Sequence, residues 1–200
     1  MRQGSGQPPE VVLARHGETE WSRTGKHTGR TDVPLTDEGR VQAELLGTSL
    51  AGIRFERIYT SPLSRAADTC RLAGLGDSAL VRDELVEWDY GEYEGRTTAE
   101  IREERPGWIL WRDGCPGGES MADVGARADR ILAELEGLAG PAALFAHGHV
   151  LRVLAARWLG LAPEDGGLLR LDTATVSMLG WEREVAVVRR WNVSPGVPVG

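Results

Sequence analysis

Short apolar runs alternate with helix-patterned segments along most of the chain. Residues 11–14 and Ala142–Ala146 are apolar throughout, which is typical of strands buried on both faces. Around these runs, apolar residues recur at spacings of three and four, the pattern of amphipathic helices. Strands interleaved with helices predict an α/β fold, a three-layer α/β/α sandwich around a mostly parallel central sheet.

Capping signals indicate where two of the helices begin. Thr36 suits an N-cap, and Gly52 suits the end of the helix that follows it. The apolar positions of that helix are Val41, Leu45, Leu46 and Leu50. A second helix is predicted to begin at Ser61-Pro62, with serine as the cap and proline at the first helical position. Arg65 then falls in the first turn of that helix or just beyond it.

The other elements follow from apolar periodicity. A helix is predicted over about residues 120–138 and another from the end of Ala142–Ala146 to near Gly160. The remaining strands are predicted over Arg57–Thr60 and residues 168–171, 175–181 and 185–191. The last two are expected to form an antiparallel hairpin around Arg183, at one edge of the sheet.

The length of 200 residues suits one domain, which we place at residues 10–192. Residues 1–9 are expected to be a disordered tail, and residues 193–200, rich in proline and glycine, a flexible one. Residues 85–118 interrupt the alternation and contain Trp88, Trp108 and Trp111. We therefore expect this insertion to pack as a small cap.

Composition excludes several classes of protein. A formal net charge of −7 argues against a broad nucleic-acid surface. No apolar run approaches the roughly 20 residues of a membrane span, and the N-terminus has no hydrophobic signal region. Cys70 and Cys115 define neither a disulfide framework nor a metal site, and Cys70 is expected to be a buried apolar filler. A cytoplasmic location fits these features.

Two histidines follow the two most apolar strands. His16 lies between Arg15 and Gly17, and His147 precedes Gly148. The carboxyl ends of parallel strands meet at one edge of a sheet, so both imidazoles are expected at the same edge. A guanidinium matches phosphate oxygens, and an imidazole can attack phosphorus. The pattern therefore predicts a phosphate site.

Arg65 and Glu87 are further candidates for this site. Arg65 follows a third strand, where a phosphate would also be attracted by the positive N-terminus of a helix. The alternative for Arg65 is a solvent-exposed helix arginine, which is the usual role of a lone arginine. Glu87 precedes Trp88, and a carboxyl group beside an indole is expected to have a raised pKa and to act as a general acid. The alternative for Glu87 is a surface glutamate.

Five ordered motifs, RHGETEW, HTGRTDVPLT, TSPLSRAADT, EWDYGEYEG and AHGH, resemble the histidine phosphatase superfamily, also called phosphoglycerate-mutase-like. The resemblance covers about residues 10–192 and is strongest to small acid phosphatases and sedoheptulose-bisphosphatase-type members. It implies a phosphomonoesterase acting on small phosphorylated metabolites through a phosphohistidine. Fixed cations can replace a metal, so no metal or other cofactor is expected. Homodimers are common among such proteins, so a homodimer is also expected.

The resemblance assigns roles to residues. His16 matches the nucleophile, Glu87 the proton donor, and Arg15, Arg65 and His147 the phosphate pocket. His16 must be neutral to attack, with a backbone carbonyl accepting its other ring proton, whereas a protonated His147 would stabilise the transferring oxygens. The expected substrate contacts are Ser22, Thr28, Gly29, Ser61, Tyr90, the amide of Gly148, and Arg152. Arg152 would reach a second phosphate or a carboxylate; the alternative is a surface arginine. His27 and His149 are expected at the mouth of the site, with no proton-transfer role.

Two alternative functions stand beside the phosphatase. A mutase of this family usually has a longer segment between the positions of Glu87 and His147, where this chain lacks an obvious arginine pair. AHGH also differs from the AHGN-like form of mutases, and Ser22 lies where many relatives have asparagine. These departures favour a phosphatase. A phospholigand-binding module without turnover is the second alternative, and the presence of all five catalytic candidates argues against it.

Overall fold

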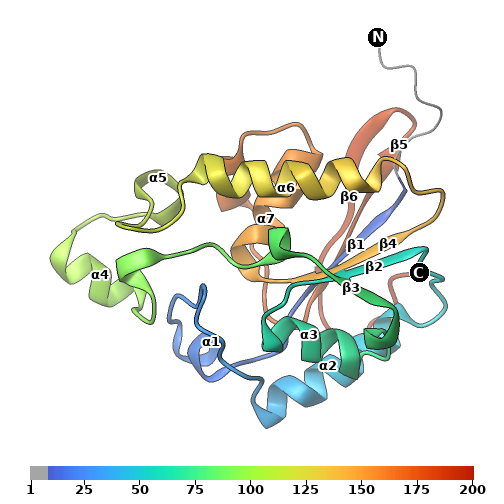
Figure 1. The fold of residues 1–200 in the computed structure, drawn as a ribbon, viewed down its shortest axis with the longest axis horizontal. Helices are drawn as coiled ribbons and strands as arrows, with labels where there is room; N and C mark the ends of the chain where they lie inside the picture. Colours follow the sequence, from blue (N-terminus) through green and yellow to red (C-terminus); the bar gives the residue numbers. More distant parts are fainter. Residues whose placement is uncertain (1–8) are drawn as a thin grey trace.

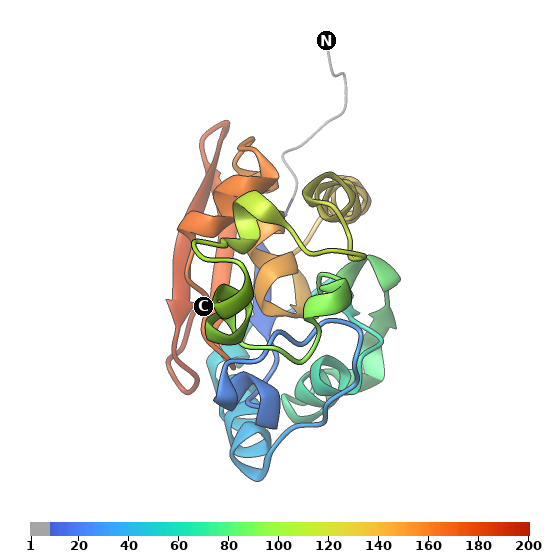
Figure 2. The ribbon, with the colours of Figure 1, turned by 90° about the vertical axis from the view of Figure 1, so that its left-hand side faces the viewer.

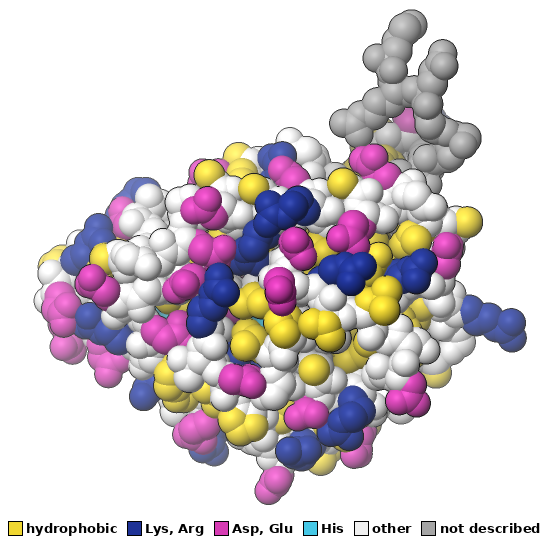
Figure 3. All heavy atoms as spheres, in the orientation of Figure 1, with side chains coloured by type: hydrophobic (Ala, Val, Ile, Leu, Met, Phe, Trp, Pro, Cys, Tyr) yellow, Lys and Arg dark blue, Asp and Glu magenta, His cyan; other side chains and the backbone are white. Residues whose placement is uncertain are grey.

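A computed structural model describes residues 9–200 of the chain. The tail predicted for residues 1–9 therefore lies outside the described residues, apart from its last position. Within the described part, no helix is both long and apolar enough to cross a membrane. Acidic and basic side chains are mixed over the face shown in Figure 3, so no broad basic area forms on that face.

A six-stranded mixed sheet lies at the centre, in the order β3-β2-β4-β1-β5-β6 (Figure 1). The strands are β1 (Val11–Arg15), β2 (Arg57–Thr60), β3 (Ala79–Val81), β4 (Ala142–Ala146), β5 (Val176–Glu182) and β6 (Val185–Val193). The first four are parallel, whereas β5 and β6 are antiparallel. Arg183, with φ of 54°, lies in the turn between β5 and β6. The predicted fold class and the antiparallel edge are confirmed.

Helices cover both faces of this sheet. They are α1 (Glu20–Thr24), α2 (Asp37–Leu50), α3 (Ser64–Leu72), α4 (Thr98–Glu104), α5 (Leu110–Asp113), α6 (Met121–Leu135) and α7 (Gly148–Trp158), with 3₁₀ turns η1 (Gly76–Ser78), η2 (Asp83–Leu85), η3 (Gly91–Tyr93) and η4 (Pro163–Leu168). Helices α2 and α3 lie on one face, and α6 and α7 lie on the other (Figures 1 and 2).

Strand β1 shows why its sequence is apolar without alternation. Val11 and Leu13 join the core that includes α6 and α7, whereas Val12 and Ala14 join the core on the side of α2 and α3. Successive strand residues point to opposite faces, so both faces of β1 need apolar side chains. The strand is thus held rigidly at the point where it delivers the residues that follow it.

The predicted apolar face of α2 is partly wrong. Leu46 is fully buried, but Val41 and Leu45 are 50% and 44% exposed. Small residues allow the helix to approach its neighbours instead. A Cβ added to Gly47, for example, would lie 2.8 Å from the carbonyl oxygen of Ala73 at the end of α3. The helix therefore packs through its glycine side as well as its leucines.

The predicted helix start at Ser61-Pro62 is also wrong. Helix α3 begins at Ser64, and its N-cap, Leu63, has no side-chain hydrogen bond. The Ser61 hydroxyl lies 2.8 Å from His147 Nε2 instead. Arg65 does fall in the first turn, as predicted. The Ser61 hydroxyl thus accepts from the Leu63 N–H within the loop and contacts His147, but it does not cap α3.

Residues 168–171 do not form the predicted strand. The 3₁₀ turn η4 occupies Pro163–Leu168, and the backbone carbonyls in this region accept from arginine side chains. Arg152 donates to Gly166 and Gly167, and Arg15 donates to Leu171. These carbonyls accept hydrogen bonds from arginine side chains instead of from a neighbouring strand. The short exposed edge strand β3 was not predicted.

The insertion at residues 85–118 lies beyond the carboxyl ends of the parallel strands and contains α4 and α5 (Figure 1). Trp88 and Trp108 are buried there, at 0% and 2% exposure, so the segment is packed. Most of the residues expected to form the flexible C-terminal tail are exposed, but Val199 packs against the rest of the chain. Val199 is 2% exposed, and its N–H donates to the Ser49 carbonyl.

Candidate active site

The carboxyl ends of three parallel strands bring the predicted catalytic residues together. Arg15 and His16 come at the end of β1, Arg65 follows β2, and His147 follows β4. The rings of His16 and His147 lie 5.2 Å apart between centroids. Arg65 Nε donates to His147 Nδ1 at 3.1 Å. Residues up to 132 positions apart in the chain, such as Arg15 and His147, thus meet at one edge of the sheet.

His16 is held as a neutral imidazole with one free ring nitrogen. Its Nδ1 lies 2.7 Å from the Gly17 carbonyl oxygen, which can only accept, so the proton is on Nδ1. Burial, followed by the charges of Arg15 and Arg65, lowers the pKa of His16 well below its usual value. The Nε2 lone pair is therefore available to attack an electrophile at neutral pH.

His147 differs from the expectation of a protonated ring. Its Nδ1 accepts from Arg65, so this nitrogen carries a lone pair, and Nε2 lies 2.8 Å from the Ser61 hydroxyl. Burial and then the positive charge of Arg65 lower the pKa of His147 well below its usual value. A cation this close makes a second charge unfavourable. His147 is thus a neutral Nε2–H donor.

The two arginines differ in their burial and in how their donors are used. Arg65 is fully buried, and its guanidinium donates to the carbonyls of Thr28, Gly29 and Thr31 as well as to His147. Arg15 donates to Leu171, but its buried Nε has no partner among the described residues. An unpaired buried N–H costs free energy unless a ligand supplies the acceptor. Arg15 therefore has a donor left for an anion.

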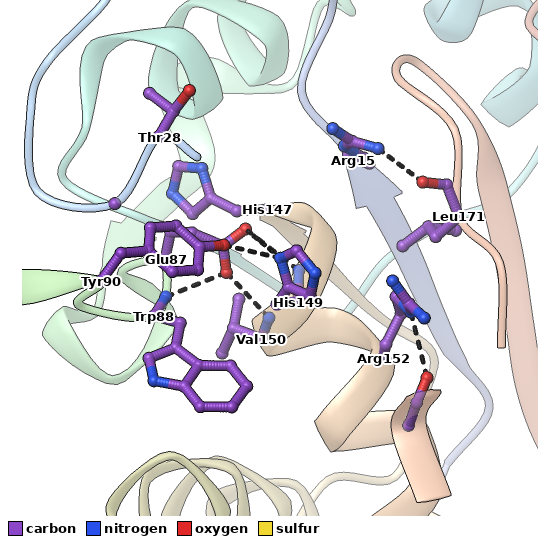
Figure 4. A network of polar contacts seen from close by, with 12 residues as sticks. Arg15, Thr28, Glu87, Trp88, Tyr90, His147, His149, Val150, Arg152 and Leu171 are labelled. Atoms are coloured by element: carbon purple, nitrogen blue, oxygen red, sulfur yellow. Dashed lines mark hydrogen bonds and ion pairs between the residues drawn. The ribbon is translucent and has the colours of Figure 1, made fainter. Parts of the chain in front are cut away.

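Glu87 is buried at 4% exposure, but it is not the carboxylic acid that Trp88 suggested. Its carboxylate points at the N-terminus of α7 (Figure 4), where it accepts from the N–H groups of His149 and Val150, and also from Trp88. Burial raises its pKa, but hydrogen bonding from His149 outweighs burial and lowers the pKa well below its usual value. The three N–H donors and the helix dipole favour the carboxylate. The expectation of a raised pKa is wrong.

A cavity of about 180 Å³ opens over His16. Its lining residues are Arg15, His16, Ser22, Gly25, Lys26, His27, Thr28, Glu87, Tyr90 and His149. A larger groove of about 670 Å³ is lined by Trp88 and other residues, most of them in the cap, and includes neither His16 nor Arg15. The smaller cavity is therefore the candidate site, because it contains the candidate nucleophile His16 and the cation of Arg15, although its volume is the lower of the two.

Some of the predicted substrate contacts line this cavity, and the others lie outside its lining. Ser22, Thr28 and Tyr90 line it, as do His27 and His149, which were expected at its mouth. Ser61, Gly29 and Gly148 lie outside the lining. The N–H of Gly29 donates to Glu94, and its carbonyl accepts from Arg65. Gly148 lies under Arg15, where an added Cβ would be 3.2 Å from the guanidinium carbon.

Arg152 is not brought to the cavity. Its guanidinium donates to Gly166 and Gly167 and lies 4.5 Å over the ring of Trp111. In Figure 4 it is turned away from Glu87. The expected contact with a second anion is therefore not formed by Arg152 in this arrangement.

The sequence analysis missed Gly25 and Lys26, which also line the cavity. Gly25 has φ of 74° and ends α1 in a left-handed conformation that suits glycine. For Lys26 a signal was available, because it is the single lysine of the chain and directly precedes the HTGRTDVPLT motif. Among residues 9–200, no three His, Cys, Asp or Glu side chains are grouped as a metal would require.

The Gly17→Ala substitution is expected to lower the free energy of unfolding by about 2 kcal/mol. A Cβ at Gly17 would lie 2.3 Å from the Gly39 carbonyl oxygen, so α2 would have to move away from the loop that holds His16. Urea denaturation measures the effect. Gly137→Ala is the matched control, since its Cβ would meet nothing within 4 Å. Equal stability of the two variants would contradict the close packing of this loop.

Stability is expected to fall as the pH drops below about 6.5, the ordinary histidine pKa. The pKa values of His16, His27, His147 and His149 are all lowered, that of His27 to about 4 by burial and then by His149. Between pH 6.5 and these lower values, the unfolded chain binds more protons than the folded one. Each such group lowers the unfolding free energy by up to about 1.4 kcal/mol per pH unit.

Urea denaturation at pH 7.5, 6.5 and 5.5 measures this dependence. The His27→Gln variant removes one titrating group and is expected to show a shallower decline over the same range. An unfolding free energy that stays constant from pH 7.5 to 5.5 would show that the histidines are not held neutral by the fold.

Comparison with known proteins adds to this geometry. The family model described as the histidine phosphatase superfamily (branch 1) matches residues 11–194. An acid phosphatase of Mycobacterium tuberculosis is 45% identical over 185 residues, 89% of this chain and 91% of that protein. A sedoheptulose 1,7-bisphosphatase of Saccharomyces cerevisiae is 40% identical, over 76% of this chain and 68% of that protein.

The chain is also similar to mutases and to solved structures. A 2,3-bisphosphoglycerate-dependent phosphoglycerate mutase of Brucella anthropi is 39% identical, over 78% of this chain and 84% of that protein. Among solved structures, the product of an open reading frame of Mycobacterium tuberculosis superposes with a TM-score of 0.89 at 41% identity. The match covers 94% of this chain and 99% of that one.

Proposed function

The chain belongs to branch 1 of the histidine phosphatase superfamily, and we propose that it hydrolyses small phosphate monoesters through a phosphohistidine formed on His16. One observation carries this proposal. His16, with its Nδ1 committed to Gly17 and its Nε2 unpaired, lines the cavity together with Arg15, whose buried Nε lacks an acceptor within the described chain. A phosphoryl group placed there would meet a nucleophile and an unsatisfied cation together.

In the first step, the His16 Nε2 lone pair forms a bond to phosphorus while the bond from phosphorus to the leaving oxygen breaks. Arg15 supplies a donor and positive charge for the transferring oxygens, and Arg65 adds positive charge from behind the ring of His147, whose Nε2–H is held by the Ser61 hydroxyl. These groups are fixed in place before substrate arrives, since Arg65 is bonded to three carbonyls and to His147. Such fixed cations take the part that a metal ion plays elsewhere, so the reaction is proposed to be metal-independent.

Glu87 donates a proton in the first step of the proposed reaction and accepts one in the second. In the free protein it is a carboxylate, so the proton for the leaving oxygen arrives with the monoanionic ester. A phosphate placed beside this carboxylate raises its pKa, which lets Glu87 take that proton and pass it to the leaving oxygen. In the second step, Glu87 accepts a proton from water. The hydroxide attacks phosphorus, the P–N bond breaks, and the electron pair returns to His16.

A screen of phosphorylated metabolites, with and without a chelator, tests this proposal. We expect release of inorganic phosphate from several esters, unchanged by the chelator, and acid-labile phosphate on the protein in rapidly quenched samples. Loss of activity with chelator and recovery with added metal would overturn metal independence. Phosphate binding with no turnover on any ester would favour the binding module over the enzyme.

Mutase activity is the second candidate, because mutases are among the relatives that the chain resembles. Measuring phosphoglycerate isomerisation beside phosphate release separates the two. A phosphatase releases phosphate faster than it isomerises, whereas isomerisation that outruns release would reverse the assignment.

A further inference from the structure

Lys26 is an exception among the cations of this chain. The sequence holds 23 lysine and arginine residues, and Lys26 is the single lysine. It lines the same cavity as His16 and Thr28. A lysine carries a compact charge on a flexible stem, whereas arginine offers a rigid fork. The position thus combines a mobile point charge with the candidate active site.

The ammonium group of Lys26 has no carboxylate partner among residues 9–200. Its printed contact is with the ring of Trp21, 5.7 Å from Nζ to the centroid. Nearby arginines are paired, as Arg23 is with Glu20 on α1. Glu100 feels the charge of Lys26, but its carboxylate is committed to the backbone N–H and hydroxyl of Thr97. Lys26 therefore lines the cavity as a residue whose ammonium group, beside the Trp21 ring, forms no ion pair with a carboxylate of residues 9–200.

The backbone of Lys26 is fixed, although its side chain is free. Its N–H donates to the Trp21 carbonyl at 2.9 Å, and its own carbonyl accepts from the Thr28 hydroxyl at 3.1 Å. It also forms an isolated bridge with Thr97, which ties this loop to the start of α4. The loop thus holds the base of the side chain in a constant place while the stem adapts to a ligand.

A single phosphoryl group does not need this third cation. Arg15 supplies an unpaired donor at His16, and Arg65 holds the other histidine, so the reacting phosphate has its cations at the sheet edge. Lys26 lines the cavity from the loop after α1, whereas Arg15 comes from the end of β1. We propose that Lys26 binds a second anionic group, a carboxylate or a second phosphate, on the leaving-group part of the substrate. This inference rests on the proposed function and narrows its substrate class.

Matched pairs of esters test the proposal. Glycerol 3-phosphate and 3-phosphoglycerate differ by a carboxylate, and fructose 1-phosphate and fructose 1,6-bisphosphate differ by a phosphate. In Lys26→Gln, the preference in kcat/KM for the doubly anionic member of a pair is expected to fall about 10- to 100-fold, the range for one charge-assisted contact. Arg23→Gln, on the exposed side of α1, is the control and is expected to keep the preference.

Because the chain has one lysine, binding can also be read without turnover. Reductive methylation with ¹³C-formaldehyde keeps the charge and labels Lys26 and the N-terminal amine, which serves as an internal reference. The Lys26 signal is expected to shift with 3-phosphoglycerate or the bisphosphate, and much less with inorganic phosphate. A response to one of these two identifies whether the second anion is a carboxylate or a phosphate.

The two readouts separate the possible failures. If no ester is hydrolysed but the Lys26 signal shifts selectively, the proposed function fails and the anion site stands. If esters are hydrolysed, but the preference survives Lys26→Gln and the signal does not distinguish the ligands, the role of Lys26 is overturned and the phosphatase stands.

Discussion

Replacing His16 with alanine is expected to lower kcat for phosphate-ester hydrolysis by at least about 10⁴-fold, because losing a nucleophile removes the covalent route altogether. The ring lines the cavity, its Nδ1–H is committed to the Gly17 carbonyl, and its Nε2 remains unpaired. Initial rates with p-nitrophenyl phosphate, together with rapid quenching for protein-bound phosphate, measure the loss. Neither turnover nor labelled protein is expected in the variant.

The control for His16→Ala tests whether the variant still folds. The ring is buried but makes no side-chain hydrogen bond outside its own loop, so the far-ultraviolet circular dichroism spectrum is expected to match that of the natural protein. Hydrolysis by the folded variant at a rate within tenfold of the natural protein would exclude His16 as the nucleophile.

Replacing Glu87 with glutamine is expected to slow phosphorylation of the protein by alkyl phosphates by about 10²–10³-fold. An alkoxide leaves poorly without a proton, and the amide cannot deliver one. A p-nitrophenolate leaves without assistance, so phosphorylation by p-nitrophenyl phosphate is expected to change much less. Rapid-quench measurement of the first half-reaction with both esters gives the comparison.

Glu87→Gln keeps the shape of the side chain, but its NH2 group replaces Oε2, which accepts from the His149 N–H. One amide oxygen remains as an acceptor for the N–H groups of Trp88 and Val150, which now bond Glu87 Oε1. Comparing urea midpoints tells a catalytic loss from a folding defect. Equal slowing with both esters in a stable variant would mean that Glu87 acts through position or charge rather than through proton transfer.

Local signals were enough for the main elements and for some residues of the site. The apolar runs at β1 and β4 have no polar positions, so they predicted buried parallel strands. The faces of α6 were also predicted, because Val124, Ala128 and Ile131 recur at helical spacing. Arg15, His16 and His147 were expected at one edge of the sheet for the same reason, since each follows such a strand.

Local sequence signals gave wrong predictions where contacts between distant segments determine the conformation. Residues 168–171 looked like a strand, but their neighbourhood serves the guanidinium groups of Arg15 and Arg152. Ser61 looked like a helix cap, but it lies against His147, 86 residues away. Neither partner is visible from the sequence within a few residues of the element.

Periodicity and motif order are properties of neighbouring residues, so they were enough to predict the α/β fold, the resemblance to a phosphatase superfamily and the residues that would carry the chemistry. The ionisation states of those residues depend instead on contacts that form when the chain folds. Glu87 is a carboxylate because α7 presents its N-terminal N–H groups to it, and His147 is neutral because Arg65 donates to its ring. A pKa depends on burial and on charges that distant segments bring close, and those distances are set by folding alone.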